Sequence, residues 1–347
     1  MKWETTDTKN IGFDFGLFGN HLNGNVNYYL NETRDLLITR RIAPSAGLDN
    51  PTLNVGKMRN QGFELELNWN DKINDFEYNV GFNISTIANK VVALANEDQT
   101  IYGVGLKYGT EHFPTQTKVG KPIGAFYLYQ ADGIFQSLEE VQAHKNSKGE
   151  LLQPNAQPGD VRFKDMNGDG VIDEDDKTYS GTGIAKVEAN LNLGASYKGF
   201  DFSAVIGSAF GNKIYNGIRY YYEGMNSASN FLKTTLNAWT PTNTKTDVPR
   251  AIYGDPNQNT RESTRFLENG DFVRLRQVQL GYTLPKALSK HIYCDRIRFY
   301  VSAENVFTIT GYSGANPEFS QGVLNSGVDR FTYPFSRSYT VGAQVSF

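Results

Sequence analysis

The sequence contains one cysteine, Cys294, which excludes an internal disulfide, and we expect this thiol to be a small buried apolar side chain. Histidine is scarce as well, and the four residues are too scattered for a zinc motif: His21, His112, His144 and His291. The 34 basic residues against 37 acidic ones give a net charge of −3, which argues against a nucleic-acid partner. No run of about 18 apolar residues occurs, which excludes a transmembrane helix.

Catalytic motifs are missing too. The stretch GYSGA at 311–315 resembles the nucleophile elbow of a hydrolase, but Ala315 replaces the final glycine and no helix is expected after it. No glycine-rich loop that would cradle a phosphate is present. We therefore predict that the protein is not an enzyme, which counts against a β-rich secreted hydrolase, one of three function classes considered.

The sequence is instead rich in Tyr, Phe and Gly, with 20, 22 and 34 residues, and apolar residues recur at every second position. This period predicts strands with one apolar and one polar face. The runs are about eight to twelve residues long, close to the length that a tilted strand needs to cross a bilayer. They cover 11–17, 22–30, 63–69, 76–84, 191–197, 200–206, 278–284, 297–309 and 339–347.

The connections between these runs alternate between short turns and long loops. Tight turns follow several strands, whereas the long connections cover 34–56, 89–118, 209–270 and 310–336. This asymmetry is typical of an outer-membrane barrel, and aromatic residues near strand ends fit an interfacial girdle. Helix is expected only in loops, at 137–145 with Ser137 as N-cap and Glu140 completing a capping box, and at 228–240. The fold class predicted is all-β, an antiparallel transmembrane barrel portion.

Four ordered stretches resemble the C-terminal part of SusC/RagA-type TonB-dependent outer-membrane transporters. They are GDVRFKDMNGDGVIDEDDKTYSG, WTPTNTKTDVPRA, RFLENGDFVRLRQVQLGYTLPK and ENVFTITGYSGANPE. The resemblance implies that residues 1–347 form about ten strands of a 22-stranded barrel. Signal peptide, TonB box and plug domain are not visible, so we expect a fragment that starts mid-barrel and transports nothing alone.

The resemblance also implies a function and partners for the parent protein. It would import large nutrients, oligosaccharides or peptides, across the cell outer membrane. A SusD-like surface lipoprotein would cap the extracellular loops, and TonB would supply energy through the plug. The alternative from another class is a soluble extracellular β-sandwich that binds carbohydrate, which would need no detergent. An isolated structure of the barrel fragment should show an open, curved sheet with two unpaired edges.

The acidic stretch DMNGDGVIDEDD is the strongest local motif. Its oxygen ligands have the spacing of a twelve-residue calcium loop with Gly170 at the turn, at Asp165, Asn167, Asp169, Val171 (through its carbonyl), Asp173 and Asp176. We expect Ca²⁺ here, because so many carboxylates in twelve residues repel one another. The other interpretation is a self-solvating turn of Asx and Gly residues. The flanking DVRFK is expected to be a strand, unlike the helix of an EF-hand.

The path of 119–183 leaves two alternatives. The strand at 76–88 should run outward and that at 187–198 inward, so the intervening chain is either one extracellular excursion or an added pair of strands; we favour the excursion. Tyr220, Tyr221 and Tyr222 lie in a long loop and are weak candidates for stacking on sugar rings, against ordinary packing. Four polar residues are expected to line the lumen: Glu64, Glu66, Asn68 and Glu77.

Overall fold

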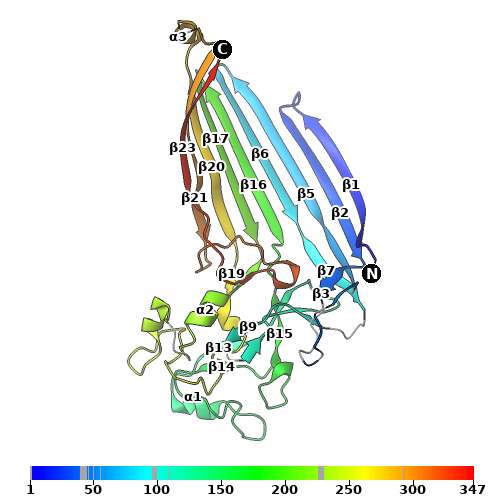
Figure 1. Ribbon diagram of the computed structural model, residues 1–347, viewed down its shortest axis with the longest axis vertical. Coiled ribbons are helices and arrows are strands. Elements are labelled where there is room, and N and C mark those ends of the chain that lie inside the picture. Colours follow the sequence, from blue (N-terminus) through cyan, green and yellow to red (C-terminus); the bar gives the residue numbers. More distant parts are fainter. Residues whose placement is uncertain are drawn as a thin grey trace.

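The structure is a computed structural model, which describes residues 2–39, 45, 47–49, 51–54, 56–95, 100–108, 110–225, 230–291 and 293–347. Within these residues no helix is long and apolar enough to cross a membrane. Two regions are distinct: a curved sheet of long strands, and a group of short elements at one end of it (Figure 1).

The long strands form one antiparallel sheet of ten strands in the described part of the chain. Nine follow one another across it, namely β1 (Thr5–Leu17), β2 (Leu22–Arg34), β5 (Gly56–Ile73), β6 (Phe76–Thr86), β16 (Val187–Tyr197), β17 (Phe200–Phe210), β20 (Phe272–Thr283), β21 (Arg296–Thr310) and β23 (Ser338–Ser346). The tenth, β7 (Ala88–Leu94), pairs with the loop-side part of β5. One edge of β1 and one edge of β23 have no partner strand here, so the sheet is open, as predicted.

Short turns join the strands at the end opposite the loops. Lys198 and Gly199 connect β16 and β17 with φ values of 46° and 88°, so both are left-handed, as a two-residue hairpin turn requires. Aromatic rings gather at this end: Phe200 and Tyr282 lie with ring centres 4.5 Å apart. Rings at strand ends are what an interfacial girdle needs.

The apolar rows of the sheet are exposed, and no second sheet covers them in the described residues. Leu280, Val301 and Val341 are direct neighbours across β20, β21 and β23, and they are 49%, 49% and 84% exposed. A soluble domain buries such a row, and exposed apolar patches of this extent mark contact with a membrane or a partner. The rows therefore have the exposure expected of a surface that faces lipid.

The connection between β6 and β16 inserts no strand between them, because these two strands pair directly from Thr86 with Val187 to Phe76 with Tyr197. The added pair of strands considered above is therefore not part of this sheet. Whether 119–183 lies outside the cell stays a prediction.

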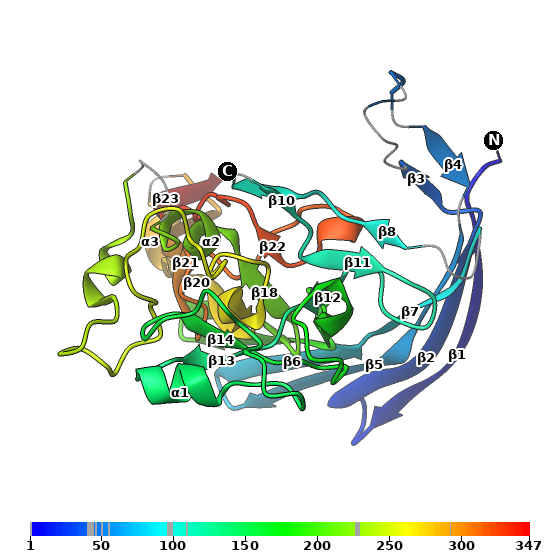
Figure 2. The same cartoon turned by 90° about the horizontal axis from the view of Figure 1, so that it is seen from below.

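Short strands and turns make up the loop region. The strands are β3 (Leu37–Thr39), β4 (Thr52–Asn54), β8 (Ile101–Tyr102), β9 (Leu106–Tyr108), β10 (Thr110–His112), β11 (Thr115–Thr117), β12 (Ala125–Leu128), β13 (Ala131–Ile134), β14 (Val161–Phe163), β15 (Thr178–Gly181), β18 (Lys213–Asn216), β19 (Leu267–Asn269) and β22 (Val328–Asp329). Seen from below, most of these strands project inside the arc of the long strands (Figure 2). The strand expected before the acidic stretch is β14, and it pairs with β13.

Helix is minor, as predicted. The helices are α1 (Leu138–Ala143), α2 (Gly217–Tyr222) and α3 (Lys286–Lys290), with 3₁₀ turns at Glu174–Asp176, Lys233–Asn237, Thr264–Phe266 and Val323–Asn325. Ser137 caps α1 by accepting from the Glu140 backbone N–H. The carboxylate of Glu140 accepts from Gln136 rather than from Ser137, one residue earlier than a capping box requires. Of the helix expected at 228–240, residues 228 and 229 lie outside the described residues, and 233–237 form a 3₁₀ turn.

The loop region has its own apolar core. One cluster joins segments far apart in sequence, with Leu106, Phe126, Leu128, Tyr215, Tyr220, Phe266 and Val328 all at most 1% exposed. Burial of each such side chain contributes about 1.5–3 kcal/mol. Cys294 is buried at the opposite end, after α3, as expected. The loops are thus a packed structure that can hold side chains in fixed positions.

Candidate functional site

The stretches that resemble the transporter family are joined by buried ion pairs. Asp160, from GDVRF, is 0% exposed and accepts from Arg250, from DVPRA, at 2.7 Å to Oδ1 and 3.0 Å to Oδ2. Asn259 donates to the same carboxylate at 3.0 Å. A two-pronged guanidinium contact of this kind is strong and directional. It fixes the segment after α1 against the loop that precedes β19.

A second such pair fixes the base of the loop after β21. Arg274 of β20 is 3% exposed, and its two terminal nitrogens donate to Glu318 and Asn316, each at 2.8 Å. Arg276 donates to the other oxygen of Glu318 at 2.9 Å. Two more of the resembling stretches therefore meet at one point of the barrel rim.

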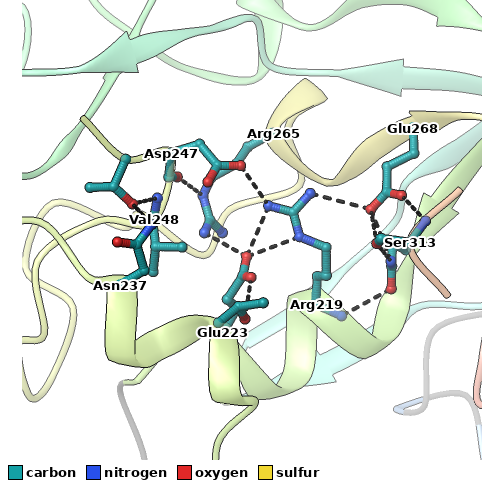
Figure 3. A network of polar contacts seen from close by, with 11 residues as sticks. Arg219, Glu223, Asn237, Asp247, Val248, Arg265, Glu268 and Ser313 are labelled. Atoms are coloured by element: carbon teal, nitrogen blue, oxygen red, sulfur yellow. Dashed lines mark hydrogen bonds and ion pairs between the residues drawn. The ribbon is translucent and has the colours of Figure 1, made fainter. Parts of the chain in front are cut away.

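A larger network surrounds α2 (Figure 3). Arg219 donates to Glu223 at 3.0 Å and to Glu268 at 3.2 Å, while Arg265 donates to Glu223 at 2.8 Å. Glu268 also accepts from the backbone and the hydroxyl of Ser313, both at 2.8 Å. Burial lowers the pKa of Arg265 to about 10, although the charge of Glu223 acts in the opposite direction. The network thus ties four loop segments together.

A cavity of about 660 Å³ lies against this network. Its lining includes Arg219 together with the carboxylates of Glu223, Asp247 and Glu268. Glu223 and Glu268 are already satisfied by the contacts given above, and Asp247, 78% exposed, pairs with Arg219 at 3.2 Å. The polar groups around this cavity therefore serve mainly to hold the loops in place.

A buried triad lies on the other side of α2. Glu262 is 3% exposed, and it pairs with Lys177 at 2.5 Å and with His112. Burial by itself raises the pKa of Glu262, but the hydrogen bond from His112 and the charge of Lys177 outweigh it and lower the pKa to about 2. The carboxylate is therefore ionised at neutral pH and links three loop segments.

The acidic loop folds around its own backbone. The two oxygens of Asp165 accept from the N–H groups of Gly168 and Gly170 at 2.7 and 2.9 Å, and Asp176, 0% exposed, accepts from Met166 at 2.6 Å. Asn167, Asp169 and Asp173 accept from backbone N–H groups two residues further on. Among the described residues, no group of three or more His, Cys, Asp or Glu side chains converges to hold a metal ion. Ca²⁺ binding stays a prediction.

The three tyrosines of α2 do not form one platform. Tyr220 is 1% exposed in the apolar core, which leaves no ring face for a sugar. Tyr221 stacks on Phe331 with ring centres 5.5 Å apart, and Tyr222 meets the same ring edge-on at 5.7 Å. The packing interpretation fits Tyr220, and sugar contact by Tyr221 and Tyr222 stays a prediction.

The four residues expected to line the lumen form a hydrated polar row. Glu66 accepts from Asn25 at 3.2 Å and from Asn68 at 2.9 Å, and Glu77 pairs with Lys72 at 2.5 Å. Glu64 is exposed. These contacts run between neighbouring strands, so the row does not converge on a single site.

Comparison with known proteins identifies the family. The family model described as TonB dependent receptor-like, beta-barrel, matches residues 1–306. The chain belongs to this TonB-dependent receptor family. It is therefore part of a transporter-type receptor rather than an enzyme, and the alternative of a soluble β-sandwich is wrong.

Relatives of this TonB-dependent receptor chain include TonB-dependent receptor P3 of Formosa agariphila, 30% identical over 100% of this chain and 34% of the relative. SusC of Bacteroides thetaiotaomicron is 27% identical over 100% of this chain and 32% of its own length. The solved structure of the RagAB peptide transporter matches with a TM-score of 0.79 at 26% identity, over 100% of this chain and 36% of that one. The chain thus spans about a third of the length of these relatives, and the predicted SusC/RagA type is confirmed.

The sequence missed the residues that hold the loops of this receptor together. Asp160, Arg250 and Glu262 were not singled out, because each stands alone in its stretch with no partner nearby in sequence. The available signal was the position of Asp160 and Arg250 inside two of the four resembling stretches. Family motifs that carry lone charges in loops indicate pairs that meet only in the fold.

Proposed function

We propose that this chain is the C-terminal part of a barrel that imports large nutrients, oligosaccharides or peptides, across the cell outer membrane. The observation that carries the proposal is the open sheet of long strands with exposed apolar rows, in a chain of the TonB-dependent receptor family. Such rows are stable in contact with hydrocarbon and unstable in water. The missing strands of the parent would close the sheet.

The partners follow from the same membership. A SusD-like surface lipoprotein would cover the packed loop region, and TonB would act through the plug of the full-length protein. The names of two relatives, SusC and the RagAB peptide transporter, support a nutrient that is either a glycan or a peptide. The residues of the loops described above carry no code that separates the two.

The test uses the full-length parent in the outer membrane of a host with and without TonB. Uptake of labelled oligosaccharides and peptides is measured as a function of concentration. Saturable uptake that disappears without TonB supports the proposal, and its absence for both nutrient classes contradicts it. We expect residues 1–347 alone to transport nothing, and saturable TonB-dependent uptake by this fragment would refute that.

We also propose that the acidic loop binds Ca²⁺. Its donors are all oxygen atoms, which suit a hard cation, and each carboxylate keeps acceptor capacity beyond its backbone contacts. Asp165 and Asp176 would draw together with Asn167 and Asp169 around the ion, which would relieve the repulsion among them. The ion would stiffen the connection between β14 and β15 and do no chemistry.

A further inference from the structure

We propose that the hollow on the outer face of the sheet β15-β12-β11-β8 is a subsite for a sugar ring that carries an anionic group. The inference rests on the proposed import function and names the substrate class for this part of the path. The hollow has a volume of about 390 Å³, and Gln116, Lys118, Lys121, Tyr127, Thr178 and Tyr179 contribute to its lining.

The alternation of β12 places the tyrosines in this hollow. Phe126 and Leu128 are 0% exposed in the loop core, so Tyr127 between them lies on the opposite face of the sheet. Tyr127 is the register partner of Tyr179 on β15, and Gln116 on β11 pairs with Ala125 on the same face. Two phenol rings and an amide therefore share one open surface.

The charge at one end of the hollow is positive. Lys118 and Lys121 are exposed, and in the part of the chain that the structure describes neither forms an ion pair with a carboxylate. The Lys121 ammonium lies 5.0 Å from the centre of the Tyr179 ring. Lys177 adds no free charge, because Glu174 and Glu262 bind its ammonium at 2.6 and 2.5 Å.

The other end of the hollow borders the acidic loop. Burial raises the pKa of Tyr127, and the charge of Asp175 raises it further, so that carboxylate is close to the phenol. An anion is repelled at the Tyr127 end and attracted at the end with Lys118 and Lys121. The hollow therefore has a direction, and a ligand would enter with its anionic group toward the lysines.

A sugar ring suits these groups better than a peptide does. The C–H faces of a pyranose can lie on the phenol rings of Tyr127 and Tyr179, Gln116 and Thr178 can bond its hydroxyls, and a carboxylate or sulfate on the ring can reach the lysines. An acidic peptide would use the ammonium groups and leave the ring faces bare. β11 and β12 also project inside the arc of the barrel strands, the side along which a nutrient passes (Figure 2).

The experiment measures binding to the full-length parent in detergent by titration calorimetry. The probes are trigalacturonate, a sulfated galactan tetrasaccharide, maltotriose and triglutamate. We expect binding of one or both anionic sugars, weakened at least about tenfold in K118Q/K121Q and made less dependent on salt. Y179L should weaken the same sugars, whereas Y179F should bind as the original does. Comparing trigalacturonate with the sulfated galactan tells carboxylate from sulfate.

The matched control is K233Q/K245Q, which removes the same charge from two exposed lysines outside the hollow. Equal losses in both double variants would overturn the proposal, because only net charge would then matter. So would anionic sugars bound no better than maltotriose, or triglutamate being the probe that depends on Lys118 and Lys121. If TonB-dependent uptake of neutral sugars or peptides persists in those cases, the import function stands and this subsite alone fails.

Discussion

Arg250 donates to both carboxylate oxygens of Asp160 across 90 residues of sequence, and Asp160 is fully buried. The pair holds together two stretches that neither the apolar core nor any strand pairing joins directly. A charge buried this deeply depends on its partner, because water cannot replace it. This relationship sets the stability of the loops more than any exposed ion pair does.

Arg250→Ala should leave Asp160 uncompensated and destabilise the loop region by about 3–5 kcal/mol. Hydrogen exchange of the full-length receptor should show faster exchange over 153–163 and 250–262, with the barrel strands unchanged. The control is Lys72→Ala, which breaks the exposed pair with Glu77 and should change nothing measurable. Equal protection of both segments in Arg250→Ala would contradict the role given to this pair.

Val301→Arg should impair insertion of the receptor into lipid vesicles by about 2–4 kcal/mol, because it puts a charge in an apolar row toward the middle of β21. Ser302→Arg is the matched control, since the adjacent residue lies on the polar face and should be tolerated. Folding is followed by the heat-modifiable mobility of the barrel in gels. If Ser302→Arg is the more damaging change, the two faces of the sheet have been assigned the wrong way round.

Acid should loosen the loop region between about pH 4.5 and pH 2. The pKa of Glu262 is lowered to about 2, so its contribution is complete above the unfolded value near 4.5 and is lost as the pH falls through the folded value. The shift corresponds to about 3 kcal/mol. Hydrogen exchange of 110–113 and 260–264, measured from pH 6 to pH 2 and corrected for intrinsic exchange, follows it. Glu262→Gln should be less stable at neutral pH and should lack most of this dependence.

Millimolar Ca²⁺ should slow exchange of the acidic loop in the full-length receptor, whereas Mg²⁺ should do so less, since the spacing suits the larger ion. Asp165→Asn with Asp169→Asn should abolish the response. Asp132→Asn, outside the loop, serves as the control. An unchanged loop at millimolar Ca²⁺ leaves the self-solvating turn as its explanation, which agrees with the backbone contacts of Asp165 and Asp176.

Much of the barrel portion could be predicted from sequence, because a strand that faces lipid on one side has to alternate residue by residue. The rows at 63–69 and 297–309 lie in β5 and β21 as expected, although β5 runs on to 18 residues. The turn at Lys198-Gly199 was equally readable, since only left-handed residues close such a hairpin. Local signals of this kind need no information about distant partners.

The predicted sites were harder to read. Tyr220 has a sequence neighbourhood that looks like an aromatic platform, yet Tyr215 and Phe266, distant in sequence, cover its ring. The capping box at α1 shifted by one residue because the carboxylate of Glu140 found the N–H of Gln136. In both cases the outcome depended on which groups were within reach, and composition does not contain that information.

The sequence by itself determined the fold class, the strand faces and the family, because period-two alternation and turn chemistry act over a few residues. Only the tertiary structure decided which lone charges pair, as with Asp160 and Arg250 or Glu262 and Lys177, and which tyrosines stay open, as with Tyr127 and Tyr179. Electrostatic attraction and burial act between atoms that are close in space. For loops folded from stretches about a hundred residues apart, that closeness exists only after the chain has folded.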